Sequence, residues 1–373
     1  MLTGKRVALG TLLVALLAVV VLVSATWTGP PPAEAQGARK FSGVTLVGVS
    51  WGSIWTEGTQ AIFCGALELE TGATCRIGSG ASSAMIAKVI AEKDNPQVDF
   101  IFVDDAFVPE LVANKAVQKI DYSKIPNAGR YFSRIQKQVE EFDGHYLPVG
   151  VQEIGIGYRA DLLKQKNLPP PTKWADLWNP AYKGGLLLTA WTANFGWAFI
   201  EAAAAVKCGD PRNLECAFRE VKKLREAGQI AVVADSGTAV EKAFASGDAW
   251  VGVVNNGRMF GLQDKGIDAK FVNPEDYRLT SSWGVVAVRK GPGWDALMAL
   301  FNLMADARNQ AVFLEQVPYG PSTVRAREFM NSKSLLRLTT TESAWSQMHM
   351  VSWDYLRQKR QELVERFNRE IVR

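Results

Sequence analysis

Histidine is scarce in this sequence, with two copies, His145 and His349, among 373 residues. Neither histidine lies near a cysteine at metal-ligand spacing, and no CxxC or HExxH segment occurs. The sequence therefore offers no zinc-binding pattern, and only two positions could complete a Ser-His-Asp triad. We expect no metal site and no cofactor.

An excess of charge of one sign is also absent. Lys and Arg number 42 against 38 Asp and Glu, and no basic block interleaved with aromatic residues occurs. The C-terminal segment 357–373 alternates in sign, and the apolar residues Leu356, Leu363, Phe367 and Ile371 share one helical stripe. This pattern is typical of a helix with one solvated face, so we expect no nucleic-acid partner.

One uncharged apolar run stands at the N-terminus, from Val7 to Val23. Lys5 and Arg6 precede it, and the small-x-small triplet Ala33-Glu34-Ala35 follows it. The pattern predicts a signal peptide over residues 1–35, cleaved on export, and a periplasmic mature chain. An uncleaved N-terminal anchor is the alternative, because seventeen residues are at the lower limit for spanning a bilayer.

Only four cysteines are present, which fits an oxidising compartment. Cys64 and Cys75 are eleven residues apart, and Cys208 and Cys216 are eight apart. Four cysteines allow three pairings, of which the two local ones are the simplest. Free buried thiols are the alternative interpretation.

Short apolar strands alternate with helical segments along the remaining chain. "TLVGV", "ATCRI" and "VDFIFV" are separated by helical patterns, and a second series contains "GLLLT", "IAVVA" and "AWVGVV". Strands of this kind with crossover helices predict parallel sheets covered on both faces. Two extended, glycine-punctuated pieces, near 148–155 and 281–287, connect the two series. At 373 residues the chain is too long for one compact core, so we expect two lobes.

The first strong motif is "PTKWADLWNPAYKGGLLLT", followed by "ASGDAWVGVVNNG" and "VPYGPST". These segments resemble the spermidine/putrescine-binding proteins of ATP-driven importers, and the similarity is spread over most of residues 43–330. The resemblance implies an α/β, two-lobed periplasmic-binding-protein fold of type II, with parallel-rich sheets and two crossover hinge strands. The expected division is 39–150 with 284–318 in one lobe, and 151–283 with 319–373 in the other. It also implies a monomeric receptor that binds a small solute and hands it to a membrane permease, without catalysis.

The family's acidic ligand residues are not matched here. The positions that hold carboxylates in polyamine-binding members correspond to Trp191, Asn194 and about Ser282, and an aromatic position corresponds to Asn255. An ammonium group buried without a paired anion loses several kcal/mol of hydration free energy. We therefore expect a zwitterionic, anionic or flat organic solute, with a polyamine as the alternative.

Candidate ligand-binding residues follow from the rule that ligands settle beyond the carboxyl ends of parallel strands. The serine-rich loop 78–83 starts a helix and could bind an anion or simply cap that helix. Asp104 and Asp105 could bind an amine or cap the helix after them. The expected ligand contacts are Trp51, Trp55, Ser79, Ser82, Ser83, Asp104, Asp105, Glu153, Trp191, Thr192, Asn194, Asn255, Ser282 and Trp283.

Two competing classes remain. Gly48-Val49-Ser50-Trp51-Gly52 matches the GxSxG pattern of serine hydrolases, but no helix follows the serine at once. Ferric-iron-binding relatives of the fold gather several tyrosines, whereas Tyr131, Tyr146, Tyr158 and Tyr319 are scattered along this chain.

Overall fold

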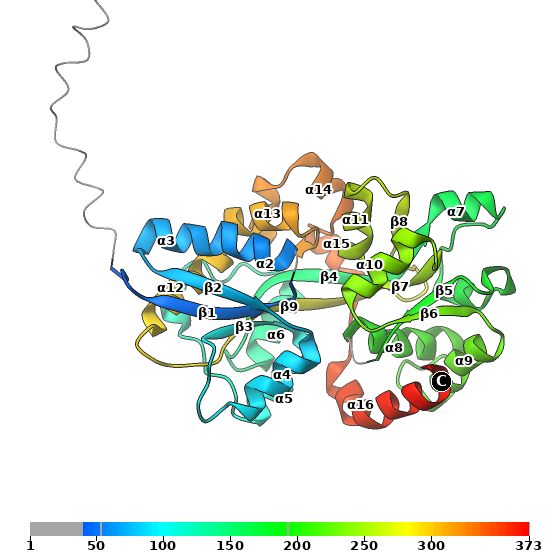
Figure 1. Ribbon diagram of the computed structural model, residues 1–373, viewed down its shortest axis with the longest axis horizontal. Coiled ribbons are helices and arrows are strands. Elements are labelled where there is room, and N and C mark those ends of the chain that lie inside the picture. The colour runs from blue at the N-terminus through cyan, green and yellow to red at the C-terminus, as the bar shows by residue number, and fades with distance from the viewer. Residues whose placement is uncertain (1–39, 53, 192–193, 373) are drawn as a thin grey trace, which may run out of the picture.

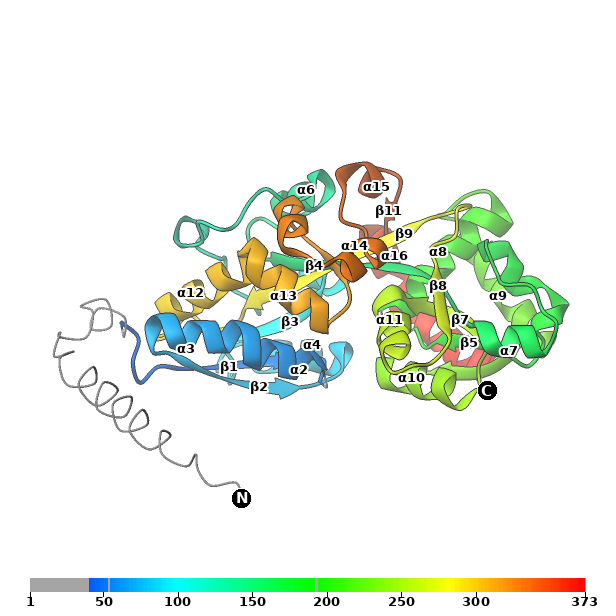
Figure 2. The ribbon, with the colours of Figure 1, turned by 90° about the horizontal axis from the view of Figure 1, so that it is seen from above.

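Two lobes lie side by side and are joined by two long strands that run through both (Figures 1 and 2). The computed structural model describes residues 40–52, 54–191 and 194–372. Residues 1–35, expected to form the leader, lie outside the described part. The two-lobed α/β fold predicted from the sequence is confirmed, while the residue boundaries of the lobes stay a prediction.

Lobe 1 is built on three parallel strands, β1 (Thr45–Ser50), β2 (Thr74–Ser79) and β3 (Phe100–Asp104), in the order β2-β1-β3. Helices cover both faces of this sheet (Figure 1). They are α2 (Ile54–Gly58), the π-helical η2 (Thr59–Cys64), α3 (Gly65–Thr71), α4 (Ser82–Ala91), α5 (Val108–Ala113), α6 (Ser133–Glu141), α12 (Trp294–Ala305) and α13 (Ala307–Gln316).

Strand β3 shows why this sheet is buried on both faces. All five of its residues are buried, and Phe100 and Phe102 pack into one apolar cluster while Ile101 and Val103 pack into another. Side chains alternate along a strand, so a continuous apolar run supplies two cores at once. The ring of Phe100 lies over Gly48 of β1, where a Cβ would fall 2.3 Å from the ring.

Lobe 2 repeats the pattern with β5 (Leu186–Thr189) paired in parallel with β6 (Ile230–Ala234) and β7 (Val251–Asn255). The short strand β8 (Ala269–Val272) pairs in antiparallel fashion with the long strand β4 (Leu147–Arg159). Its helices are α7 (Ala160–Gln165), α8 (Asn194–Cys208), α9 (Leu214–Glu226), α10 (Gly237–Ser246) and α11 (Asn256–Asp264).

Both local disulfides expected from the spacing are present. Cys64–Cys75 ties the helical segment before α3 to β2 in lobe 1, and Cys208–Cys216 ties the end of α8 to α9 in lobe 2. No free cysteine remains in the described part of the chain. Each bond closes a short loop within one lobe, so neither restricts the movement of one lobe against the other.

The two hinge strands are β4 (Leu147–Arg159) and β9 (Leu279–Ala287), which pair with each other in antiparallel fashion. β9 also pairs with β3 of lobe 1, and β4 also pairs with β7 of lobe 2. The strands therefore follow one path, β2-β1-β3-β9-β4-β7-β5-β6. The extended crossovers predicted near 148–155 and 281–287 are these strands.

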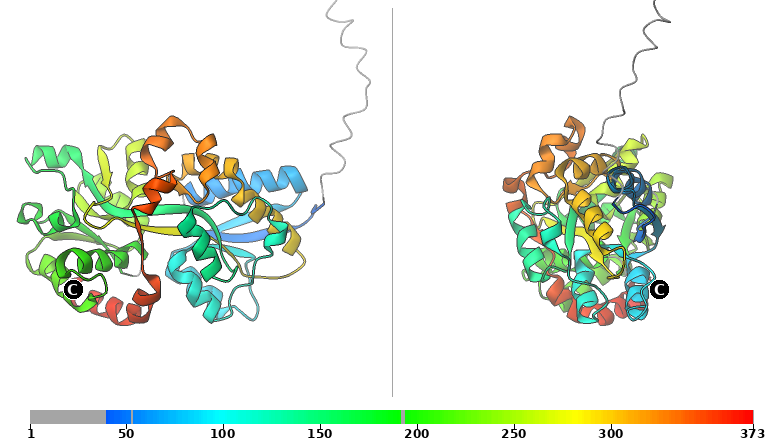
Figure 3. Two further views of the ribbon diagram at one scale, coloured as in Figure 1. Left: turned by 180° about the vertical axis from the view of Figure 1, so that it is seen from behind. Right: turned by 90° about the vertical axis from the view of Figure 1, so that its left-hand side faces the viewer.

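After α13 the chain crosses between the lobes once more and ends on lobe 2 (Figure 3). This part contains β10 (Gly320–Pro321), α14 (Ser332–Arg337), α15 (Glu342–Ser346), β11 (His349–Met350), α16 (Trp353–Phe367) and the π-helical η8 (Asn368–Val372). Short 3-10 turns complete the described chain: η3 (Asp105–Phe107), η4 (Tyr122–Lys124), η5 (Trp174–Trp178), η6 (Pro180–Tyr182) and η7 (Val324–Phe329).

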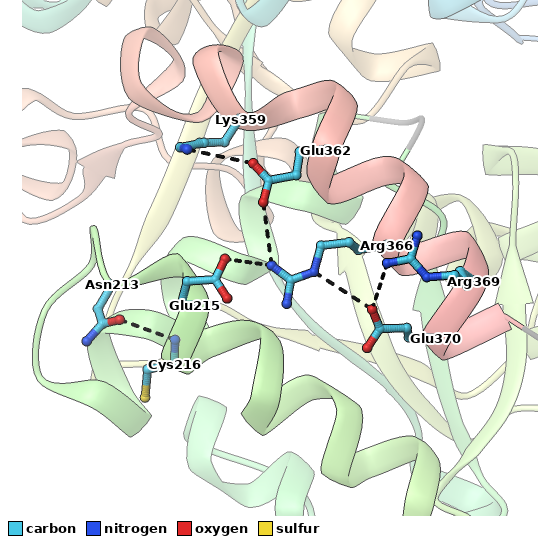
Figure 4. A network of polar contacts seen from close by, with 8 residues as sticks. All are labelled: Asn213, Glu215, Cys216, Lys359, Glu362, Arg366, Arg369 and Glu370. Atoms are coloured by element: carbon cyan, nitrogen blue, oxygen red, sulfur yellow. Dashed lines mark hydrogen bonds and ion pairs between the residues drawn. The ribbon is translucent and has the colours of Figure 1, made fainter.

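Helix α16 is held by the apolar stripe predicted from the sequence. Leu356, Leu363, Phe367 and Ile371 are all buried. On the polar side the guanidinium of Arg366 lies 2.6 Å from a carboxylate oxygen of Glu215 in α9 and within 3.8 Å of Glu362 and Glu370 (Figure 4). The alternating charges thus form ion pairs along one edge of the helix rather than a basic patch.

None of the described helices is both apolar and long enough to traverse a bilayer.

Candidate ligand-binding site

A cavity of about 380 Å³ lies between the lobes. Loops after the carboxyl ends of β1, β2, β3, β6 and β7 line it, together with both hinge strands, as the strand-end rule requires. Figure 2 shows the helices that follow these loops, α2 and α4 in lobe 1 and α10 and α11 in lobe 2, facing one another. The lining residues are Trp51, Gly52, Trp55, Ser79, Gly80, Ala81, Ser82, Ser83, Asp104, Gln152, Asp235, Ser236, Gly237, Thr238, Asn255, Arg258, Trp283 and Tyr319.

Three indoles and a phenol form one wall of the cavity. The ring centroids of Trp51 and Trp55 lie 4.6 Å apart, those of Trp55 and Trp283 lie 4.5 Å apart, and Tyr319 lies 5.3 Å from Trp55. Trp55 and Trp283 are 4 % and 1 % exposed, whereas Trp51 is partly exposed. The three indoles pack edge to face against one another, and the Tyr319 ring is tilted by 39° from that of Trp55. The rings therefore form a wall, and Trp51 contributes its partly exposed ring to the cavity lining.

Asp104 is the buried acid of this cavity. Its carboxylate accepts hydrogen bonds from the Ser82 hydroxyl at 3.1 Å and from the Gln152 side chain at 3.3 Å. Ser82 in turn accepts a hydrogen bond from the indole N–H of Trp51 at 2.9 Å. The Asp104 side chain makes no capping hydrogen bond to the turn after it. Its role is therefore to hold the cavity wall, not to cap a helix.

Hydrogen bonds continue from Gln152 into lobe 2. The amide of Asn255 donates to Gln152 Oε1 at 3.0 Å, and the Tyr319 hydroxyl donates to Asn255 Oδ1 at 3.1 Å. Burial raises the pKa of Tyr319 to about 12, so its hydroxyl stays protonated and donates at neutral pH. One polar chain thus crosses the cavity floor from lobe 1 to lobe 2.

The start of α4 has no side-chain cap. Ala81 occupies the cap position without a capping hydrogen bond, and Ser82, which could have capped the helix, donates to Asp104 instead. Among the residues that the structure describes, no side chain therefore caps the first-turn amides of α4, which adjoin the cavity lining at Ala81 to Ser83, as an anion-binding turn requires.

Arg258 brings a positive charge to the lobe 2 side of the cavity. Its Nη1 lies 2.8 Å from a carboxylate oxygen of Glu241, whose other oxygen lies 3.1 Å from the ammonium of Lys265. The Nε–H of Arg258 is buried and finds no hydrogen-bond partner within the described chain. The guanidinium rests against Gly237, the first residue of α10.

Eight of the fourteen expected contact residues line this cavity. They are Trp51, Trp55, Ser79, Ser82, Ser83, Asp104, Asn255 and Trp283.

Three expected residues, Asp105, Glu153 and Ser282, lie on the opposite side of their backbone and do not line the cavity. Each is one position from a residue that does, because neighbouring side chains of an extended chain point to opposite faces. Glu153 instead accepts hydrogen bonds from the Thr339 hydroxyl at 2.6 Å and the Asn273 amide at 3.1 Å. Burial raises the pKa of Glu153.

Asp105 belongs to a separate buried network behind the cavity. Its carboxylate accepts hydrogen bonds from the Gln138 amide at 2.8 Å, the Ser282 backbone N–H at 2.9 Å and the Trp353 indole N–H at 2.6 Å. Burial is the largest influence and raises the pKa of Asp105 to about 6, although these donors oppose the rise. The acid therefore joins the end of β3 to the hinge and to α16.

Trp191 was expected to touch the ligand, and the structure corrects this expectation. Its ring is 1 % exposed and stacks on Phe367 with a centroid distance of 4.5 Å, with Phe218 at 5.8 Å. The C-terminal segment covers this part of lobe 2, so the indole belongs to its core. Thr192 and the side chain of Asn194 lie outside the described residues.

Ten lining residues are not among the expected contacts: Gly52, Gly80, Ala81, Gln152, Asp235, Ser236, Gly237, Thr238, Arg258 and Tyr319. A signal was present for four of them, because Asp235 to Thr238 directly follow the apolar strand β6. The strand-end rule, applied to that strand as to the others, identifies this loop.

The GxSxG segment shows no catalytic arrangement. Ser50 is fully buried and its hydroxyl lies 2.9 Å from that of Thr56. Neither histidine lines the cavity, and among the scattered tyrosines only Tyr319 does. Within residues 40–52, 54–191 and 194–372, no group of three or more His, Cys, Asp or Glu is placed to hold a metal ion.

Comparison with known proteins gives consistent results. Residues 65–334 match the family model described as bacterial extracellular solute-binding protein. The chain is 26 % identical over 254 residues to the spermidine/putrescine-binding periplasmic protein of Escherichia coli (strain K12), which covers 67 % of this chain and 70 % of that protein. It is 29 % identical over 159 residues to the gamma-aminobutyric acid-binding protein of Pseudomonas aeruginosa, covering 40 % of this chain and 44 % of that protein.

Solved structures share the fold at lower identity. A putative spermidine/putrescine ABC transporter from Listeria monocytogenes superimposes with a TM-score of 0.71 at 19 % identity, covering 88 % of this chain and 99 % of that one. An ABC transporter protein from Clostridium perfringens gives a TM-score of 0.69 at 20 % identity, covering 87 % and 99 %.

Proposed function

The chain belongs to the bacterial extracellular solute-binding proteins, and from this premise we propose that it captures a small zwitterionic, anionic or flat organic solute between its lobes. It then delivers the solute to the permease of an ATP-binding-cassette importer. One observation carries this proposal: the cavity is lined by strand-end loops of both lobes and by both hinge strands. A solute that contacts all of these parts stabilises the closed arrangement over the open one.

The lining explains the preference for such a solute. Trp51 offers an aromatic surface for a flat or alkyl group, and the uncapped first turn of α4 offers backbone N–H donors. Arg258 adds a positive charge on the opposite wall. The roles of the eight lining residues predicted from the sequence, and of the ten additional ones, are proposed on this geometry.

A polyamine is the second candidate. The relatives named for spermidine and putrescine favour it, and Asp104 and Asp235 supply two carboxylates to the lining. Against it, Arg258 would repel a second ammonium group, and the positions Trp191 and Ser282 carry no acid and lie outside the lining.

We further propose an exported, monomeric receptor without enzymatic activity and without a nucleic-acid partner. In this proposal the leader is removed near Ala35.

A thermal-shift screen of the exported, purified protein tests the proposal. Its panel contains polyamines, amino acids, opines, organophosphonates and aromatic acids. A ligand at one hundred times its dissociation constant adds about 2.7 kcal/mol to the free energy of unfolding. We expect selective stabilisation by one chemical class. Selective stabilisation by putrescine or spermidine instead selects the second candidate.

Mass spectrometry of small molecules released on denaturation complements the screen. Failure of every compound, together with the absence of any released solute, contradicts the receptor function.

A further inference from the structure

The guanidinium of Arg258 lies against the start of a helix, a position that is unfavourable for a cation. A Cβ built on Gly237 would fall 2.3 Å from Cζ and Nη2 of Arg258 and 2.5 Å from Nε, so the charged group lies directly on this α-carbon. Gly237 is the first residue of α10. The Ser236 hydroxyl caps this helix by accepting a hydrogen bond from the Ala239 N–H at 3.3 Å, and the other N–H groups of the first turn carry partial positive charge. The guanidinium of Arg258 and the N-terminus of α10 are both positive and lie in contact, so a bound anion would relieve their repulsion.

Glu241 compensates only part of this charge. It lies one turn further along α10, and its two carboxylate oxygens are shared between Arg258 and Lys265, at 2.8 and 3.1 Å. These three side chains together carry one net positive charge, although the Lys265 side chain is 61 % exposed and solvent screens its share. The Nε–H of Arg258 is buried and has no acceptor among the residues described. A guanidinium carries five N–H donors in a planar fork that suits an oxyanion, and the Nε–H donor of this fork is unused by the residues described.

The opposite wall of the same cavity carries a buried negative charge. Asp104 is 7 % exposed and is the last residue of β3 in lobe 1. Trp51 lies close to this acid, because the side chains of Trp51 and Asp104 both form a hydrogen bond with the Ser82 hydroxyl. The partly exposed ring of Trp51 can face a cation. Asp235 also lines the cavity but is exposed, so solvent and salt screen its charge. The buried charges of the two lobes are thus opposite in sign.

From this arrangement we propose that the solute is dipolar and has a fixed orientation. Its oxyanion, a carboxylate, phosphonate or sulfonate, binds Arg258 and the first turn of α10, and its ammonium group binds Asp104 beside Trp51. The inference rests on the proposed receptor function and names its substrate class. A diamine places a cation against Arg258, and a dianion places a negative charge against Asp104. Only a dipolar solute satisfies both lobes at once.

Matched sets of solutes test this inference by calorimetry on the purified protein. Each set has one carbon-chain length, from one to five carbons between the end groups, and contains the amino acid, the diamine and the dicarboxylic acid. Aminoalkylphosphonates and aminoalkylsulfonates extend the first class. We expect at least one dipolar member to bind ten times more tightly than the diamine and diacid of its length. Tighter binding of diamines or diacids, or no binding of any dipolar member, overturns the inference.

Variants then test the position of the oxyanion. Gly237→Ala changes no charge, but its methyl group displaces the guanidinium, so affinity for the dipolar solute should fall about tenfold or more, as expected for a lost charged hydrogen bond. Gly261→Ala is the matched control, since a Cβ at Gly261 of α11 meets nothing within 4 Å. If the two variants bind the dipolar solute with equal affinity, the proposed position of its oxyanion at Arg258 and α10 is contradicted.

Arg258→Gln separates a binding role from a structural one. In the wild type the dipolar solute should bind more tightly than the amine that lacks its oxyanion. We expect Arg258→Gln to abolish this preference, with the variant's folding checked by circular dichroism. A preference that survives the substitution overturns the inference.

Released solutes distinguish failure of this inference from failure of the receptor function. If the purified protein releases a diamine or an uncharged aromatic compound, the dipolar class is wrong and the receptor function stands. If no solute is released and none binds, both proposals fail.

Discussion

Asp105 is a carboxylate at the junction of three parts of the molecule, and its environment makes the stability of the protein depend on pH. Burial raises its pKa from 3.8 to about 6. Between these two values the unfolded chain loses the proton while the folded protein keeps it, so the free energy of unfolding falls as pH rises. Above pH 6 both states are ionised and the effect no longer changes.

The first prediction is that Asp105→Asn removes this dependence. From the shift of the pKa, the change in this contribution between pH 4 and pH 6 is on the order of 2 kcal/mol. Urea unfolding of the wild type and of the variant at pH 4, 5, 6 and 7 gives the free energy of unfolding of each. The contribution of Asp105 is the change with pH in the difference between these two free energies. Asp143→Asn is the control, because Asp143 is exposed and its partner Lys119 lowers its pKa. Parallel curves for wild type and Asp105→Asn contradict the prediction.

The second prediction concerns Trp51, the indole that presents its surface to the cavity. Trp51→Ala should weaken solute binding by about 1 kcal/mol or more, the value of a lost aromatic contact. Trp294→Ala is a suitable control, because Trp294 is a partly buried tryptophan of lobe 1 that does not line the cavity. Calorimetry with the solute found by the screen provides the measurement. If the two variants bind the solute equally well, Trp51 does not contact it.

At the scale of single residues, the sequence identified which loops border the cavity better than it identified which side chains of those loops point into it. Asp104 and Ser82 were expected from the ends of strands and Trp283 from the second crossover, and all three line the cavity. Their neighbours Asp105 and Ser282 share those positions in the sequence but point away. A sequence shows that alternate side chains of a strand face opposite sides. Which of the two sets faces the cleft depends on how the strand pairs within the sheet, and the sequence does not show this.

At the scale of elements, the C-terminal helix α16 shows that a sequence can predict a helix and its buried face without predicting where that face packs. Its apolar stripe was visible, but its docking place was not, because a stripe specifies burial and not the partner. The partner includes Trp191, whose ring stacks on Phe367. Trp191, in a loop beyond a strand, was therefore expected to contact the ligand, although it packs against a helix that begins only at Trp353. By contrast, β1, β3, β5 and β7 were predicted correctly because their apolar runs are short and bounded.

The third prediction tests how α16 is anchored at its first residue. Trp353 is buried and donates its indole N–H to Asp105 Oδ1 at 2.6 Å. Trp353→Phe keeps an aromatic ring but loses this bond, which costs about 1.5–3 kcal/mol when the acceptor is charged and about 1 kcal/mol when it is neutral. The destabilisation should therefore be larger at pH 7 than at pH 4.5, as measured by urea unfolding.

Trp345→Phe provides the control for that measurement. Trp345 is equally buried, and its indole N–H donates to the backbone carbonyl of Thr339 at 3.3 Å, an acceptor that does not titrate. Its cost should be the same at both pH values. Equal pH dependence of the two variants contradicts the assigned role of Asp105 as a charged acceptor.

At the scale of the whole molecule, the covalent and polar connections decide which movements are possible. β4, β9 and the segment from 317 to 352 all cross between the lobes, while each disulfide stays within one lobe. Gln152 lies at the centre of the crossing, since it donates to Asp104 of lobe 1 and accepts from Asn255 of lobe 2. A solute held by both walls adds contacts that exist only when the lobes are shut, so binding and closure are coupled.

The fourth prediction follows from this coupling. Small-angle X-ray scattering should show a radius of gyration that decreases on addition of the bound solute and follows its binding isotherm, because closure brings the masses of the two lobes together. Arg258→Gln should shift the scattering transition to higher solute concentration together with the calorimetric one, since the solute stabilises the shut state only by its differential affinity for it. If heat of binding is measured while the scattering profile stays constant, the solute binds without moving the lobes. Capture would then depend on a preformed cavity rather than on the hinge.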